Sequence, residues 1–121
     1  MWCIFGAGTG GADADTFKGV APGAVIYMAR VIDGSGSGDD AGLIKAIDWC
    51  VGHNLRGGFP TIQILSMSVG IGPTDGNDAL SQAIDAVATE HGFIPVASSG
   101  NSGAVSTAGS PSVAEKAIGV G

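Results

Sequence analysis

The chain alternates short apolar runs with longer segments of helical periodicity, and this alternation constrains its fold more than any other feature. Apolar residues dominate three runs, at residues 61–69, 93–97 and 117–120. Between the first two runs, residues 78–91 repeat apolar side chains at helical spacing. Strands that alternate with helices of this length predict parallel crossover connections. The pattern therefore predicts an α/β fold with a mostly parallel sheet.

The first half of the chain adds one strand and one helix to this pattern. Residues 24–32 are almost entirely apolar and are predicted as a strand. Asp39 and Asp40 favour the start of a helix, through capping and through the helix dipole, and this helix is predicted to reach about His53. We expect a three-layer sandwich with a sheet of about four strands, formed by residues 1–121 as a single domain.

Apolar spacing also predicts which side chains form the core. Helical spacing in the two predicted helices selects seven residues: Leu43, Ile47, Cys50, Val51, Leu80, Ile84 and Val87. Residues 61–69 are apolar almost throughout, which predicts a strand that is buried on both faces.

Composition and charge exclude several classes of function. The formal net charge is −6, which argues against a nucleic-acid surface and against binding to anionic membranes. No apolar run approaches the roughly 18 residues of a membrane-spanning helix. Residues 1–6 contain no basic region and no signal-peptide pattern, so the localisation stays open between the cytosol and export through a signal elsewhere.

The chain offers few residues for disulfide or metal chemistry. Cys3 and Cys50 are too few for a disulfide framework, although they leave open a single pairing. No structural zinc site is expected, because the chain has two histidines and no Cys-x-x-Cys motif. Asp13 and Asp15 alternate as in part of a calcium loop, but a solvated loop explains them more simply. No cofactor is therefore expected, with calcium as a weak alternative.

The segment Ser-Ser-Gly-Asn-Ser-Gly at residues 98–103 is the strongest candidate for a functional site. It directly follows the predicted strand at residues 93–97. Ligands of open α/β sheets bind at the carboxyl edge of the strands, which is where this segment places Asn101. A side-chain amide at that edge can donate a hydrogen bond to a developing oxyanion. The alternative is that Asn101 stabilises a turn.

Several motifs, in order along the chain, resemble those of the subtilisin-like serine proteases, the subtilases of peptidase family S8. The first is Gly-Val-Ala-Pro at residues 19–22, followed by a strand and a Gly-Ser-Gly-Ser loop at residues 34–37. The later similar segments are residues 44–50, 64–70, 95–103, 110–113 and 117–121. Each motif is weak alone, but together they cover nearly the whole chain in the order and close to the spacing of the family.

The resemblance implies roles for particular residues. Asn101 would be the oxyanion-hole asparagine and hence the catalytic group of this chain. Two backbone segments would line the cleft for an extended peptide substrate, which adds to the protein like a strand. They are Ser68, Val69 and Gly70 on one side, and Ser98, Ser99 and Gly100 on the other.

The same resemblance implies that the catalytic triad of the family is missing. The chain contains neither the His-Gly-Thr-His motif nor the Gly-Thr-Ser-Met-Ala motif. Residues 7–10 resemble the helix just after the catalytic His of the family, so we expect a segment that lies between His and Ser. Conventional proteolysis is not expected from this chain alone. The link at residues 54–60 is longer than usual in the family, which leaves this connection open.

Two other classes of function stay open. A small esterase-like hydrolase would need a serine such as Ser98, Ser99 or Ser102 beside a base. His53 and His91 are the only histidines, and both fall at helix C-termini, where they favour the helix dipole and are expected far from Asn101. A non-catalytic module would form homo-oligomers through strand edges and apolar surfaces that a shortened family sheet leaves uncovered.

Overall fold

The computed structural model of the chain describes residues 20–121. The chain divides into two compact units, residues 1–30 and residues 31–121. In the first unit, residues 20–30 contain a turn that is closed by a hydrogen bond from the Ala24 N–H to the Ala21 carbonyl (3.0 Å). The second unit contains every helix and strand of the described residues.

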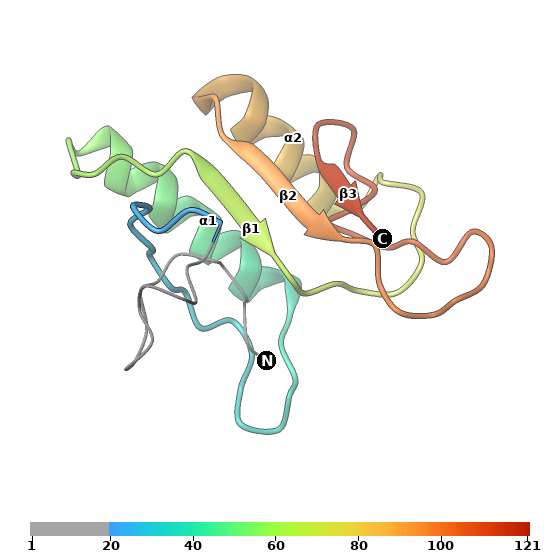
Figure 1. The fold of residues 1–121 in the computed structure, drawn as a ribbon. Coiled ribbons are helices and arrows are strands. Elements are labelled where there is room, and N and C mark those ends of the chain that lie inside the picture. The colour runs from blue at the N-terminus through green and yellow to red at the C-terminus, as the bar shows by residue number, and fades with distance from the viewer. Residues whose placement is uncertain (1–19) are drawn as a thin grey trace. The chain divides into compact units, whose positions relative to one another are not determined.

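Two helices form where the capping residues predict them (Figure 1). Helix α1 spans Asp40–Leu55, and the carboxylate of its N-cap, Asp39, accepts a hydrogen bond from the Gly42 N–H (2.7 Å). Helix α2 spans Ala79–His91 and ends at Gly92, whose φ of 70° is the left-handed conformation typical of a glycine C-cap. Both predicted helices are confirmed.

Three strands form one parallel sheet in the order β1-β2-β3. They are β1 at Ile64–Met67, β2 at Ile94–Ser98 and β3 at Ile118–Val120. Each strand lies within a predicted apolar run or one residue beyond it, although β1 is shorter than its run. The α/β class with a parallel sheet is confirmed.

The strand predicted at residues 24–32 is not present, and the sheet of the described residues has three strands instead of about four. An apolar run becomes a buried strand only when neighbouring strands satisfy its backbone and cover its side chains. In this run, 60% of Val25 and 68% of Met28 are exposed, so the burial that would favour a strand is missing.

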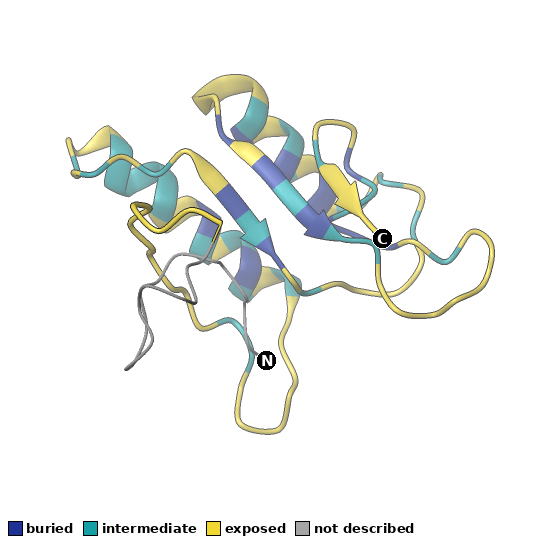
Figure 2. Cartoon of the chain, in the orientation of Figure 1, coloured by how far each residue is buried: buried dark blue, intermediate teal, exposed yellow. Residues whose placement is uncertain are grey.

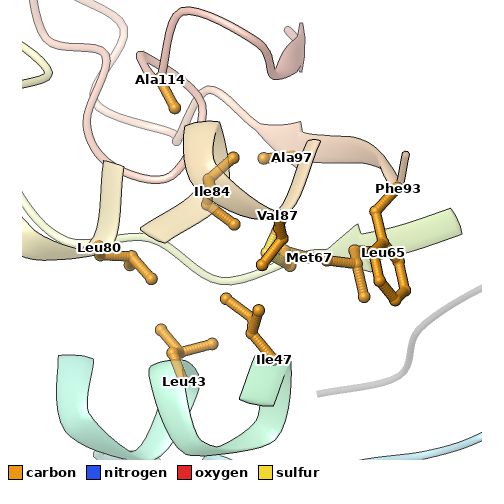
Figure 3. Packing of buried hydrophobic residues seen from close by; sticks show 10 residues of the cluster. All are labelled: Leu43, Ile47, Leu65, Met67, Leu80, Ile84, Val87, Phe93, Ala97 and Ala114. Carbon is orange, nitrogen blue, oxygen red and sulfur yellow. The ribbon is translucent and has the colours of Figure 1, made fainter. Parts of the chain in front are cut away.

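The core lies between the two helices and one face of the sheet (Figure 3). Its centre is Leu80 and Ile84 of α2, which are fully buried. The other members come from α1, from the strands and from the segments beside them: Leu43, Ile47, Leu65, Met67, Val87, Phe93, Ala97 and Ala114. Five of the seven predicted core residues are buried, and Cys50 and Val51 are partly buried against them.

The sheet is buried on one face only, as the alternating colours along β1 and β2 show (Figure 2). In β1, Leu65 and Met67 point into the core, whereas 58% of Ile64 is exposed. The prediction that this strand is buried on both faces is therefore wrong for the described residues. Of the three expected layers, these residues form two, the sheet and one layer of helices.

The long link between α1 and β1 is held by side chains at the end of α1. Asn54 donates from Nδ2 to the Ile62 carbonyl (2.7 Å) and accepts from the Ile62 N–H through Oδ1 (2.8 Å). The ring of His53 is hydrogen-bonded to the Pro60 carbonyl (3.1 Å) through Nε2. These contacts satisfy backbone groups that a longer loop would otherwise leave to solvent, and they determine the connection that the sequence left open.

Candidate functional site

The register of the sheet brings the two predicted binding segments to the same edge. Met67, the last residue of β1, is paired with Ala97 of the parallel strand β2. Residues 68–70 and residues 98–101 therefore leave neighbouring strands side by side, at their carboxyl ends. This is the edge at which open α/β sheets bind their ligands.

The segment after β1 is held by backbone contacts a few residues downstream. Ser68 and Gly70 are exposed, while Val69 packs against the core. The Ile71 N–H donates to the Ser110 carbonyl (2.9 Å), and Pro73 forms an antiparallel bridge with Gly109. Residues 68–70 thus combine two exposed residues with an anchored continuation.

The segment after β2 turns away from the sheet at a glycine. Ser99 still donates from its N–H to the Val120 carbonyl of β3 (2.8 Å), and both Ser98 and Ser99 are half-buried. Gly100 then adopts a φ of +98°, a conformation that side chains rarely allow. Asn101 follows at an exposed position, and its amide makes no hydrogen bond to any described residue. It is open to a ligand at this edge.

The histidines lie at the other edge of the sheet. His91 ends α2 immediately before β2 begins, so the five residues of β2, about 16 Å at 3.3 Å per residue, separate it from the carboxyl edge. His53 is engaged by Pro60 and stacks on Trp49, with ring centroids 5.5 Å apart. Neither histidine is placed to activate Ser102, as the topology predicted.

A cluster of polar side chains near this edge, two of them fully buried, escaped the sequence prediction. Asp78 caps α2 by accepting from the Ser81 N–H (2.9 Å), and its second oxygen accepts from the hydroxyl of Ser81 (2.8 Å). The hydroxyl groups of Ser81 and Ser110 are in turn hydrogen-bonded (3.0 Å). The sequence signals the cap, but the pairing of Ser81 with Ser110 joins positions 29 residues apart and has no local signal.

Hydrogen bonding stabilises the ionised form of Asp78. Burial would raise the pKa of this carboxyl, but donors at Ser81, Ser110 and Thr74 outweigh it and lower the pKa from 3.8 to about 2. Asp78 is therefore an anion throughout the neutral range, and the hydroxyl groups around it are oriented as donors.

The predicted metal and disulfide chemistry falls mostly outside the described residues. Asp13, Asp15 and Cys3 all lie there, so neither the weak calcium site nor the pairing with Cys50 is tested. Within residues 20–121, no group of three potential metal ligands comes together. Burial raises the pKa of the Cys50 thiol, which favours its protonated form. In the same part of the chain, no helix has the length and apolar character to cross a membrane.

Comparison with known proteins shows similarity to one protease family. The sequence profile of the subtilase family, peptidase S8, matches residues 5–121. Over 106 residues, 85% of this chain, the sequence is 37% identical to subtilisin E of Bacillus subtilis. It is 36% identical to pyrolysin of Pyrococcus furiosus over 88% of this chain, and 33% identical to the serine protease AprX of Bacillus subtilis over 95%. The matched region is 25% of subtilisin E, 7% of pyrolysin and 27% of AprX.

Proposed function

The chain belongs to the subtilase family, and from this we propose that it supplies the substrate-binding edge and the oxyanion donor of a subtilisin-like serine endopeptidase. In this proposal, residues 1–121 are part of a subtilase catalytic domain. Asn101 is the oxyanion donor. The substrate-lining residues are Ser68, Val69 and Gly70 on one side of the cleft and Ser98, Ser99 and Gly100 on the other.

The pairing of Met67 with Ala97 in the parallel sheet carries the proposal. It sets two backbone segments beside each other at the carboxyl edge, and one of them ends in Asn101. An extended peptide can hydrogen-bond to such exposed backbone as an added strand, while the neighbouring side chains select its residues. The exposure of Ser68 and Gly70 supports this role.

The amide of Asn101 would stabilise the negative charge that develops on the carbonyl oxygen of the scissile bond. The carbonyl oxygen gains negative charge in the transition state, so the amide stabilises the oxyanion more than it stabilises the ground-state carbonyl. Loss of one such donor costs about 10²–10³ in kcat, a magnitude taken from subtilisin itself and not from this geometry.

The proposal assigns no nucleophile and no general base to this chain. A reactive serine needs an adjacent base. His53 is held by Pro60, and His91 lies at the opposite edge of the sheet. We therefore expect peptide binding, and no conventional proteolysis, from the chain by itself.

A product-like peptide tests the proposed site. We expect a tetrapeptide with a free C-terminal carboxylate to bind at this edge, with one carboxylate oxygen on the Asn101 amide. Asn101→Ala should weaken its binding about tenfold, the lower end of what a hydrogen bond to a charged group contributes, since Asn101 is exposed. NMR titration of the ¹⁵N-labelled chain measures the affinity and shows whether the amides of residues 68–70 and 98–101 shift.

The same peptide with a C-terminal amide is the matched ligand, and Ser102→Ala is the matched variant. Binding of the peptide amide should hardly respond to Asn101→Ala, and Ser102→Ala should leave both ligands unaffected. A site elsewhere is indicated if the shifted amides lie outside the two segments. Ester hydrolysis that is lost in Ser102→Ala would instead favour the stand-alone hydrolase.

Self-association is a second candidate function, and the open face of the sheet favours it. Four apolar side chains on this face are about half exposed: Ile64, Ile94, Ile118 and Val120. In addition, β1 and β3 each have one edge without a neighbouring strand among the described residues. Uncovered apolar faces and strand edges favour association. Light scattering over a range of concentrations tests this, and a constant monomer mass would contradict it.

A further inference from the structure

Four side chains connect the start of α2 to the segment at residues 109–111. The Thr74 hydroxyl and the Ser81 hydroxyl both donate to the same oxygen of Asp78, Oδ2, at 3.0 and 2.8 Å. The hydroxyl of Ser110 completes the group through its hydrogen bond to Ser81 (3.0 Å). We call Thr74, Asp78, Ser81 and Ser110 the Asp78 network.

The Asp78 network is more than a helix cap. Capping α2 requires one acceptor, and Asp78 Oδ1 already provides it for the Ser81 N–H (2.9 Å). The second oxygen, Asp78 Oδ2, accepts only from hydroxyl groups. Both serines of the network, Ser81 and Ser110, have no exposed surface. Buried hydroxyl groups remain buried only with partners, so the interactions of these serines determine where Ser110 lies.

The backbone of Ser110 anchors the chain directly after the substrate-lining segment. Its carbonyl accepts from the Ile71 N–H (2.9 Å), directly after residues 68–70. The adjacent Gly109 lies so close to the carbonyl oxygens of Ile71 and Gly72 that an added Cβ would overlap them. The side chain of Ser110 is thus held by α2, while its backbone holds the continuation of the substrate-lining segment.

We propose that Asp78, Ser81 and Ser110 are positioning residues that set the place of residues 68–70 for an incoming peptide. The inference rests on the proposed function of this edge. Backbone hydrogen bonds to a peptide need donors and acceptors in register with it, and a misplacement of about 1 Å can cost roughly 10²-fold in rate. The network supplies that register from beneath the site, without touching the peptide.

The test is Asp78→Asn, measured by amide hydrogen exchange and by peptide affinity. The asparagine keeps an oxygen that caps α2, but it replaces the acceptor of the hydroxyl groups with an NH₂ group. We expect the Ile71 amide to exchange about tenfold faster relative to the core amides of α2. We expect the tetrapeptide to bind about 3- to 10-fold more weakly.

The matched control is Asp85→Asn, the same chemical change on the same helix. Asp85 is half-buried and accepts from the Lys116 N–H (2.8 Å), outside the Asp78 network. This variant should leave both the exchange of Ile71 and the peptide affinity unchanged. Ser81→Ala provides a second variant, because it keeps the Asp78 cap and a good helix former while removing the hydroxyl that bridges to Ser110.

The possible outcomes separate the inference from the proposed function. One outcome for Asp78→Asn is that the amides of the whole core exchange uniformly faster while the affinity for the tetrapeptide is unchanged. That result would mean that Asp78 only caps α2, and it would overturn the inference. If the unsubstituted chain does not bind the peptide, the proposed function fails, yet the exchange of Ile71 still decides whether the network positions this segment. Selective exchange at Ile71 together with weaker binding supports both.

Discussion

The two segments that leave the carboxyl edge of the sheet are held in different ways. The segment after β1 is tied to residues 109–110 by the backbone and to the start of α2 by the Asp78 network. The segment after β2 is exposed from Gly100 to Ser106, with positive φ at Gly100, Gly103 and Ser106. A hydrogen bond from the Thr107 hydroxyl to the Ala104 carbonyl (2.7 Å) closes this segment on itself, without a link to α2.

This difference separates two tasks within one candidate site. Recognition of an extended backbone needs a rigid template, because several hydrogen bonds must form in register. Stabilisation of an oxyanion needs one donor in the right place, which a turn at Gly100 can present. The anchored segment should therefore respond to substitutions in its support, and the exposed segment should respond mainly to changes in Asn101 itself.

The largest expected effect comes from the packing that supports the anchored segment. Ile84→Ala removes a fully buried side chain of α2 and should lower the free energy of unfolding by about 2–5 kcal/mol. Val105→Ala, in the exposed segment with 95% of its side chain exposed, should change it by less than about 0.5 kcal/mol. Urea denaturation followed by circular dichroism measures both. Equal losses would contradict the comparison.

A pair of glycines gives the next largest effect. Gly109→Ala would place a Cβ against the carbonyl oxygens of Ile71 and Gly72, at a cost of about 3 kcal/mol. Gly103 has open space around it and a φ of +69°, so Gly103→Ala should cost only the conformational term of about 1–2 kcal/mol. Urea denaturation of the two variants compares the loss of stability caused by steric overlap with the loss caused by backbone conformation. A larger cost at Gly103 would mean that the exposed segment is packed.

The pH dependence of the free energy of unfolding tests the Asp78 network, with a smaller expected effect. The pKa of Asp78 is about 2 in the folded chain and ordinarily 3.8, so the ionised carboxylate stabilises the fold above about pH 4. This contribution is lost as the pH falls from about 4 through 2. The stability difference between the unsubstituted chain and Asp78→Asn should therefore be present at pH 7 and shrink toward pH 2. A difference that is constant with pH would contradict the role of the charge.

The smallest effect is expected for Asn101→Ala on stability. Asn101 is exposed and makes no hydrogen bond to any described residue, so its loss should change the free energy of unfolding by less than about 0.5 kcal/mol. The same variant should weaken the carboxylate peptide, as proposed above. A clear loss of stability would instead favour the interpretation of Asn101 as a turn-stabilising residue.

Local signals made the helices predictable, and neighbours decided the strands. Asp39, Asp78 and Gly92 mark helix ends through hydrogen bonds and backbone conformations that span only a few residues. The run at residues 24–32 carries an equally strong apolar signal but forms no strand. A strand depends on partners that are distant in sequence, and a single apolar run does not contain that information.

The candidate site shows the same division. A strand followed by Ser-Ser-Gly-Asn predicts an amide at the edge of a sheet, and the turn at Gly100 agrees with it. The support of residues 68–70 was not predictable, because Ser81 and Ser110 are ordinary serines in the sequence. Their importance arises only when burial removes the water that would otherwise be their partner.

The sequence by itself determined the family, both helices and the three strands after residue 60, and the candidate residues at the ends of two strands. These properties depend on local periodicity, capping and motifs, which short stretches of chain express completely. Only the tertiary structure decided that the described sheet has one covered face and three strands, and that Ser81 of α2 is hydrogen-bonded to Ser110 beside one half of the candidate site. Those properties depend on which distant groups share a buried space, since burial makes a hydrogen bond between them obligatory.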